Sequence, residues 1–299
     1  MTLLCIACGK DDDHPSGGSD KQIAYRNLKV MSFNALVTHT GDKGDERWSV
    51  RGPGCVKMIQ TTKPDVIGLQ ECRYEQYSYL ASSLNDYYAG VYIPEKYKNF
   101  GTCILYRKDV FNLDSSGYLW FSDNPTVPSP AWESICDDPT YRTYIWADLR
   151  YKTIGVPLRI YSTHFPRQYE KTNEEARYKC ASAMVSHAKK EIGDDGIVFM
   201  TGDMNCAMSD AKGKYSLTPF TMWMKSARES LPSGKKDDWR SLNSMSADAP
   251  FSDGTKSIDH IFYRNVLPDA YRTVIDNYGV PFISDHYPIL FDCRIEYEK

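Results

Sequence analysis

The sequence predicts an α/β fold in which two packed β-sheets are covered by helices. Nine short runs have the composition of strands, and several are apolar throughout, which is typical of strands buried on both faces. Only a few helical patterns lie between these runs. Many strands with few helices favour two stacked sheets with helices outside them, and 299 residues can form one such domain.

The predicted strands follow one another along the whole chain after an N-terminal segment. They cover residues 28–34, 66–70, 89–93, 102–107, 143–151, 156–163, 197–201, 257–263 and 288–295. The run at 143–151 alternates like a half-exposed strand, whereas several of the others are short apolar runs. Two segments rich in Pro, Ser, Asp and Gly, 122–141 and 232–256, are predicted to be long loops, and such loops often carry function.

Three helices are predicted between the strands. The clearest one begins at Thr172, with Glu175 completing a capping box, and ends at Gly193. It places Ala176, Cys180, Met184 and Ala188 on one face. A second helix is expected from Thr218, with Pro219 in its first turn, to a point before Pro232, and a third near residues 75–88.

Residues 1–24 differ in composition from the rest of the chain. A short apolar stretch reaches small residues and Cys8, and an acidic, Gly- and Ser-rich stretch follows. This pattern resembles the end of a bacterial lipoprotein signal followed by a flexible tether. We therefore expect an exported protein, anchored to the bacterial envelope by lipid on Cys8, on the periplasmic or surface side of the outer membrane. A redox or metal pair of Cys5 and Cys8 is disfavoured because no second pair follows.

Charge and cysteine usage restrict the remaining function classes. The formal net charge is -3, so bulk electrostatics does not draw the chain to nucleic acid, although a local basic groove would suffice for binding. Nucleic acid is therefore a possible partner, but not the favoured one. The nine cysteines are widely spaced and form neither a disulfide framework nor a zinc pattern.

Polar side chains stand at or beside the ends of six predicted strands. They are Asn34, Glu71, His164, Asp203 with Asn205, Asp259, and Asp285 with His286. Each one alone has an ordinary explanation as a turn residue, a cap or a hydrogen-bonded core residue. Because buried carboxylates are costly without a partner, the repetition at so many strand ends indicates a shared site.

The chemistry of these residues is consistent with one reaction. Carboxylate and amide oxygens without thiolates are the ligands of Mg²⁺ or Mn²⁺, which bind substrate phosphates while keeping several waters. Histidines beside such a site act as acids or bases, or donate hydrogen bonds to phosphate oxygens. This set suits hydrolysis of a phosphate ester, in which a polarised water attacks phosphorus in line.

Six motifs in this order resemble the endonuclease/exonuclease/phosphatase superfamily. They are VMSFNAL, DVIGLQE, YSTHF, TGDMN, SIDHIF and ISDHYPILF, and the resemblance covers residues 27 to about 296. The resemblance implies a four-layer α/β sandwich of the DNase I-like kind, with two packed central sheets flanked by helices and the active site at one edge. It also implies a single domain over residues 25–299, for which we expect a monomer.

The resemblance assigns the metal and substrate groups. Glu71 corresponds to the principal metal-binding glutamate, and Asn34 to an asparagine that supports metal and phosphate. Asp285 corresponds to an acidic position that is sometimes a second metal ligand. His164 corresponds to a family position that serves in catalysis and phosphate binding. Arg142 corresponds to a position where many members have an arginine near the substrate.

The resemblance also assigns the groups that act on water. Asp203 and Asn205 correspond to the pair that orients or activates the attacking water and holds phosphoryl oxygens. Asp259 corresponds to the carboxylate that orients the essential His286. The neighbouring His260 is expected to be structural, because alternation along a strand points it away from Asp259.

The favoured function is that of a Mg²⁺- or Mn²⁺-dependent phosphodiesterase. Alternatives are a phosphomonoesterase acting on a small sugar or inositol phosphate, a DNase or a sphingomyelinase, and a non-catalytic surface lipoprotein that binds a phosphate ligand. The signature of inositol polyphosphate 5-phosphatases is missing from the TKSIDHIFYR segment, which disfavours that branch. A sphingomyelinase would need exposed aromatic residues in a hairpin; Trp120, Phe121 and Trp132 are candidates, but a buried strand end is favoured.

Overall fold

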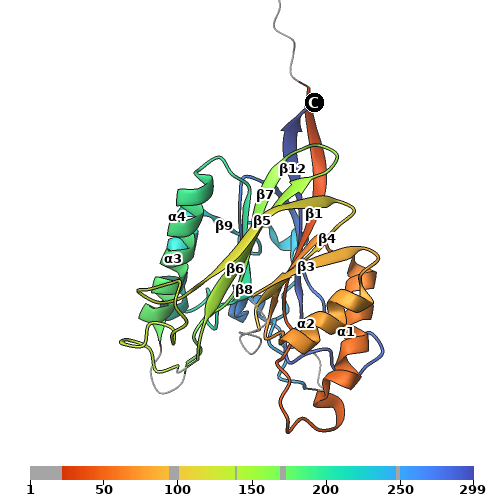
Figure 1. The fold of residues 1–299 in the computed structure, drawn as a ribbon, viewed down its shortest axis with the longest axis vertical. Coiled ribbons are helices and arrows are strands. Elements are labelled where there is room, and N and C mark those ends of the chain that lie inside the picture. The colour runs from red at the N-terminus through yellow and green to blue at the C-terminus, as the bar shows by residue number, and fades with distance from the viewer. Residues whose placement is uncertain (1–21, 94–100, 139, 169–172, 247–249) are drawn as a thin grey trace, which may run out of the picture.

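Two six-stranded sheets pack face to face with a pair of helices on each outer side, so that the domain has the four layers expected (Figure 1). The computed structural model describes residues 22–93, 101–138, 140–168, 173–246 and 250–299. The expected lipid anchor at Cys8 and most of the expected tether lie outside these described residues. The described fold begins with the strand at Ile23.

The first sheet carries the N-terminal strands and the last one. Its strands are β1 (Ile23–Asn34), β2 (Val66–Gln70), β3 (Tyr88–Tyr92), β4 (Cys103–Arg107), β11 (Leu267–Thr273) and β12 (Ile289–Glu298), arranged in the order β11-β12-β1-β2-β4-β3. Helices α1 (Trp48–Thr62) and α2 (Tyr74–Ser83) cover its outer face. Met58, Ile59 and Leu80 of these helices are fully buried against Met31 and Leu69 of the sheet.

The second sheet carries the middle of the chain. Its strands are β5 (Phe111–Trp120), β6 (Thr143–Tyr151), β7 (Pro157–His164), β8 (Val198–Asp203), β9 (Lys225–Ser226) and β10 (Asp259–Arg264), in the order β5-β6-β7-β8-β10-β9. Helices α3 (Glu174–Ile192) and α4 (Ala211–Trp223) cover its outer face. Short 3-10 turns η1 (Gly44–Glu46), η3 (Ser233–Lys235) and η4 (Gly254–Lys256) lie in the loops.

The layer between the sheets changes from apolar to polar along its length. Its apolar part includes Leu28, Val30, Val66, Ile160 and Phe199. Toward the carboxyl ends of β1 and β2 it becomes polar: Gln70 donates from Nε2 to Oγ of Ser162 at 3.0 Å, and Ser32 donates to Oε1 of Gln70 at 3.4 Å. A Cβ added to Gly68 would lie 1.8 Å from Oγ1 of Thr201, so the two sheets approach closely at this end.

All nine predicted strands are present, with small shifts at their ends, and three further strands were missed. β5 and β11 are edge strands whose sequences hold polar residues, and each has an irregular register with its neighbour. The two-residue β9 is too short for any pattern. Edge strands have one unburied side, which is why their sequences lack the apolar run that identified the central strands.

The helix predictions were correct in part. In α3 the predicted apolar face of Ala176, Cys180, Met184 and Ala188 is buried. The N-cap is Asn173, at φ 53° and without a side-chain cap bond, and the predicted cap Thr172 lies outside the described residues.

The second predicted helix was placed wrongly. Helix α4 ends at Trp223, and Asp210 caps it by accepting from the backbone nitrogen of Gly213 at 2.6 Å. Pro219, expected in the first turn, lies inside the helix. The third predicted helix, α2, stops at Ser83, and Tyr88 belongs to β3.

Helix α1 was not predicted because its first turns contain Gly52, Pro53 and Gly54, a composition typical of loops. Both glycines have a packing reason. A Cβ on Gly52 would lie 2.9 Å from the ring of Tyr79, and one on Gly54 would lie 2.4 Å from the side chain of Val280. Tertiary contacts therefore outweigh local propensity here.

Candidate active site

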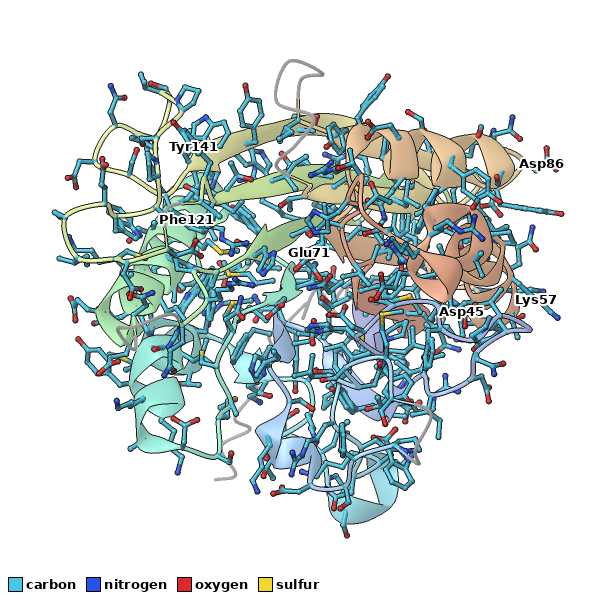
Figure 2. All side chains as sticks on the ribbon, turned by 90° about the horizontal axis from the view of Figure 1, so that it is seen from below. Asp45, Lys57, Glu71, Asp86, Phe121 and Tyr141 are labelled. Atoms are coloured by element: carbon cyan, nitrogen blue, oxygen red, sulfur yellow. The ribbon has the colours of Figure 1, made fainter. Side chains whose placement is uncertain are left out.

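The carboxyl ends of two parallel strand pairs meet at one edge of the sandwich. β1 runs parallel to β2 in the first sheet, and β7 runs parallel to β8 in the second. Asn34 ends β1 and Glu71 follows β2, while His164 ends β7 and Asp203 ends β8. Figure 2 looks onto this edge and shows Glu71 near its centre, between the two halves of the sandwich.

The register of the second sheet places three site residues in one row. Asp203 pairs with His164 across the parallel β7–β8 ladder and with Asp259 across the antiparallel β8–β10 ladder. Paired residues direct their side chains to the same face of a sheet. Accordingly, Nε2 of His164 lies 3.4 Å from Oδ2 of Asp203. All three side chains are buried.

Glu71 reaches the site through a left-handed backbone conformation. Its φ is 51°, which is unusual for a residue with a side chain. Strict alternation would direct it to the helix side, as with Leu69. The left-handed residue instead allows Oε1 to accept from Nδ2 of Asn34 at 3.2 Å, and Oε2 to accept from the backbone nitrogen of Val37 at 3.1 Å. Such strain costs on the order of 1 kcal/mol and is often found at functional sites.

Asn34 connects the two sheets at the site. Its Nδ2 donates to Oδ2 of Asp203 at 3.0 Å as well as to Glu71, and its Oδ1 accepts from the backbone nitrogen of Leu36. Its backbone carbonyl accepts from Oγ of Ser284 at 2.6 Å. A single amide thus holds a carboxylate from each sheet in place.

His286 forms a buried pair with Asp259. Nδ1 of His286 lies 2.7 Å from Oδ2 of Asp259, and Nε2 lies 3.9 Å from Oδ2 of Asp203. Burial lowers the pKa of His286, but the charge and hydrogen bond of Asp259 outweigh it and raise that pKa to about 10. His286 is therefore cationic at neutral pH, with Nδ1 directed to Asp259.

The other buried groups are shifted by their surroundings in different directions. Burial and the neighbouring charge of Asp259 raise the pKa of Asp203 to about 7. Burial, with a further contribution from the positive charge of Arg142, places the pKa of His164 well below its usual value. A carboxyl group with a pKa near neutrality is suited to exchange a proton with water.

Asn205 also lies at the site, where two hydrogen bonds hold it. It follows the end of β8 in a left-handed conformation with φ 51°, and its backbone nitrogen donates to Oδ1 of Asp203 at 2.9 Å. Its Nδ2 donates to the carbonyl of Phe165. Gly202 belongs to β8, and a Cβ there would lie 2.5 Å from the carbonyl of Thr163, so the β7–β8 contact requires glycine.

Two groups of donor atoms have the spacing of a metal site within the described residues. One comprises Glu71, His164 and Asp203, and the other Asp203, Asp259 and His286; in each, the donor atoms lie within 4.8 Å of one another. Because His286 is protonated and paired, the group containing Glu71, with Asn34 beside it, fits a hard cation better.

Asp285 belongs to neither group of donor atoms. Its Oδ1 accepts a 3.3 Å hydrogen bond from Oγ of Ser284. Burial raises its pKa, and the charge of Glu71 raises it further. The two carboxylates are therefore near enough to repel each other, which a bound dication would relieve.

Arg142 stands just before β6, next to the end of β7. The register of these strands pairs Tyr144 with Thr163, so Arg142 precedes the residue opposite His164. Its Nη2 and Nε donate to Oδ2 of Asp138 at 2.9 and 3.3 Å. The predicted substrate arginine is therefore at the site, and its orientation is fixed by a buried carboxylate.

Sequence reasoning did not identify Arg51, which stabilises the site from behind. This fully buried side chain donates to the carbonyls of Ala35, Leu36 and Ile283 at 2.7, 2.9 and 3.1 Å. It thus joins the segment after Asn34 to the segment before His286. The helix that carries it was not predicted, which concealed the only signal, a charged residue on a buried helix face.

The expected structural roles of His260 and of the aromatic loop residues agree with their contacts in the structure. Nε2 of His260 contacts the carbonyl of Cys206 at 2.8 Å. Trp120 and Phe121 are buried, and the indole nitrogen of Trp132 donates to the sulfur of Cys180 at 3.2 Å. No helix within the described ranges combines the length and apolar character needed to cross a membrane.

Comparisons with known proteins agree with this fold. An endonuclease/exonuclease/phosphatase from Bacteroides vulgatus is 22% identical and superimposes with a TM-score of 0.75, covering 90% of this chain and 98% of its own. The mannosyl-6-phosphatase Bt3783 of Bacteroides thetaiotaomicron is 24% identical, with a TM-score of 0.74 and coverage of 89% and 99%. TDP2 of D. rerio, complexed with single-strand DNA product, is 20% identical, with a TM-score of 0.66 and coverage of 89% and 98%.

At these identities the structural likeness shows the fold alone. The family model is more specific, because it matches residues 31–286, a span that runs from the strand carrying Asn34 to His286 itself. The chain belongs to the Endonuclease/Exonuclease/phosphatase family, whose members are hydrolases of phosphate esters.

Proposed function

We propose that the protein hydrolyses phosphate esters by attack of a water molecule on phosphorus, with Mg²⁺ or Mn²⁺ as cofactor. The observation that carries this proposal is the position of Asp203. It accepts a hydrogen bond from Asn34, which also holds the metal candidate Glu71, and it lies 3.9 Å from Nε2 of His286. Asp203 thus lies between a metal-binding group and a cationic hydrogen-bond donor.

Each residue has a defined task in this proposal. Asp203 orients the attacking water and accepts its proton, for which a pKa of about 7 is suitable. Cationic His286, held by Asp259, donates a hydrogen bond to a phosphoryl oxygen in the transition state. The second N–H of the Asn205 side-chain amide and an N–H of the His164 ring donate to the remaining substrate oxygens.

Glu71, with Asn34 beside it, is proposed to hold the metal ion. The cation would neutralise charge on the phosphoryl oxygens and lower the pKa of a bound water. Asp285 is a proposed additional ligand, since its carboxylate is close enough to that of Glu71 for mutual repulsion. Filling of the site would therefore remove an electrostatic cost from the fold.

Two classes of ester fit this core, because attack on phosphorus uses the same groups in both. The diester that the sequence favoured remains a prediction. A monoester of a small sugar is the second candidate, supported by the structural likeness to a mannosyl-6-phosphatase. A DNA substrate is supported by the likeness to TDP2, but the net charge of -3 does not favour it.

One experiment tests the function directly. Purified protein is given mono- and bis-nitrophenyl phosphate, sugar phosphates, plasmid DNA and sphingomyelin, with and without Mg²⁺ or Mn²⁺. We expect turnover of at least one ester, loss of turnover after chelation, and recovery when metal is returned. Full turnover after exhaustive chelation contradicts the metal assignment, and binding of phosphate without any turnover favours the non-catalytic alternative.

We also propose export and anchoring by lipid on Cys8. The support is the sequence around that cysteine alone, since residues 1–21 lie outside the described part. Expression of the full chain in a bacterial host, followed by membrane fractionation and mass spectrometry, tests it. We expect a lipid-modified Cys8 in the membrane fraction and release of a Cys8→Ser variant; unmodified wild-type protein would refute the proposal.

A further inference from the structure

The segment directly after His164 has an unusual backbone. Every polar backbone group from Phe165 to Arg167 is hydrogen bonded. Phe165 donates to the carbonyl of Asp203 at 2.9 Å and accepts from Nδ2 of Asn205 at 2.9 Å. The carbonyl of Pro166 accepts from Nη1 of Arg177 at 3.0 Å.

Arg167 itself is fixed on both sides of its backbone. Its nitrogen donates to Oδ2 of Asp138 at 3.0 Å, and its carbonyl accepts from Nδ2 of Asn173 at 2.8 Å. The side chains of Asp138, Asn173 and Arg177 are buried and come from outside this segment. Surface loops usually leave such groups to water, so this loop is held rigid by buried residues.

The rigid loop presents an exposed arginine beside the site. Arg167 lies three residues after His164 and is exposed, whereas the anchors behind it are buried. The same Oδ2 of Asp138 that fixes the Arg167 backbone also binds the guanidinium of Arg142. Both arginines are close to His164 along the chain or the sheet, because Arg142 precedes the residue opposite His164 in the β6–β7 ladder and Arg167 follows it by three residues.

Asp138 is a buried carboxylate that positions both Arg142 and Arg167 next to the proposed phosphate site. This arrangement indicates that the site recognises one more anionic oxygen of the substrate than the metal and His286 can bind. In a phosphodiester, the free oxygens on phosphorus are used by the metal and by the His286 side of the proposed site. A phosphomonoester has one more free oxygen and carries more charge at neutral pH. Arginine, with its planar set of donors, suits that terminal oxygen.

We propose that Arg167, together with Arg142, forms a subsite for the terminal oxygens of a phosphomonoester, and that Asp138 is its positioning residue. This inference rests on the proposed phosphate-ester site and names its substrate class. It assigns to Arg167 a role that neither the strand-end pattern nor the family motifs indicated. The substrate is then a dianionic monoester in preference to a diester.

The test measures binding, so that it is independent of turnover. Isothermal titration calorimetry at pH 8 with saturating Mg²⁺ compares inorganic phosphate with dimethyl phosphate, which lacks terminal oxygens. The variants are Arg167→Gln, Arg167→Lys and the control Arg150→Gln. Arg150 is also exposed and is paired with Asp114 at the far end of β6, so the control changes net charge equally.

We expect wild-type protein to prefer phosphate, and Arg167→Gln to weaken phosphate binding by about 10- to 100-fold, as expected for the loss of a charged hydrogen bond. Dimethyl phosphate affinity should change less than about threefold. Arg167→Lys should recover part of the loss, and Arg150→Gln should bind like the wild type. Thermal midpoints of all variants should agree, since the Arg167 side chain is exposed.

Other outcomes overturn the proposal. Equal weakening of both ligands would show a general electrostatic effect, and unchanged phosphate affinity would show that Arg167 does not contact the ligand. Weakening of DNA binding alone would assign Arg167 to a second phosphate of a polymer. If phosphate binding depends on Arg167 but no ester is hydrolysed, this inference is supported and the proposed function is contradicted. If an ester is hydrolysed with metal but phosphate binding does not depend on Arg167, the proposed function is supported and this inference is contradicted.

Discussion

The two parallel strand pairs bring similar polar residues to the same edge but bury them differently. Glu71, after β2, keeps 25% of its side chain exposed, whereas Asp203, at the end of β8, keeps 3%. A metal ion that retains waters needs an open ligand. A group that exchanges protons near neutral pH needs burial to shift its pKa. In the proposed function, this difference in burial separates a metal half, Asn34 and Glu71, from a proton half, Asp203, Asp259 and His286.

The two halves are not independent, because two contacts cross between the sheets. Asn34 of the first sheet donates to Asp203 of the second. His286 lies just before β12 of the first sheet and is paired with Asp259 of the second. Substitutions that affect only one half should therefore show whether the division is functional.

The largest effect is expected from the proton half. Asp203→Asn removes the proposed proton acceptor while keeping the size of the side chain, so kcat should fall by about 10²- to 10⁴-fold. Extra metal should not restore it. Steady-state kinetics across a metal titration measures this, with the exposed Asp195→Asn as control. Recovery at high metal concentration would place Asp203 in the metal half.

A smaller effect, of a different kind, is expected from the metal half. Glu71→Gln keeps hydrogen-bonding oxygen but loses a charge, so the apparent affinity for Mn²⁺ should fall by about 10- to 100-fold. Turnover should recover at high metal concentration. Exposed Glu75→Gln on α2 is the matched control. A loss of kcat that metal cannot restore would argue against the division.

The pairing of His286 with Asp259 predicts a pH dependence of stability. The folded-state pKa of His286, about 10, is above its usual value, so the pair stabilises the fold below the usual value and the stabilisation is lost as pH rises toward 10. In Asp259→Asn the principal cause of the raised pKa is absent. The thermal midpoint of metal-free wild type should therefore fall relative to this variant between about pH 7 and 10. Parallel curves would refute the pairing.

The smallest effect concerns the spacing between the halves. Gly68→Ala places a methyl group against Thr201 of the facing sheet, and overpacking of this kind costs about 1–3 kcal/mol. Chemical denaturation measures it. Gly41→Ala, where an added Cβ meets nothing within 4 Å, is the control and should be neutral. Activity should fall with stability in the first variant, because both halves move apart.

The sequence was sufficient for the central strands and for the position of most site residues. Their apolar runs and polar ends are local signals, and register then brings His164, Asp203 and Asp259 together. The sequence was insufficient where a single backbone angle or a contact distant in the chain decides the local structure. The left-handed conformation of Glu71 has no sequence signature, since Glu rarely adopts it.

Long-range contacts explain the other failures. Helix α1 has the local composition of a turn and is helical because its glycines fit against Tyr79 and Val280. The anchoring of the Phe165–Arg167 segment depends on Asp138 and Asn173, which come from different parts of the chain. Hydrophobic periodicity in the sequence carries no information on such long-range pairings.

The position of β12 has a consequence for when the candidate site is complete. This strand is the last in chain order, yet it lies inside its sheet between β1 and β11 and pairs with β1 from Ile23 to Ser32. Until it arrives, β1 has an open edge and His286 has not met Asp259. Such non-local pairing is slow to form. After synthesis, the candidate site is therefore complete only once this strand is inserted, so folding sets the time at which the site can act.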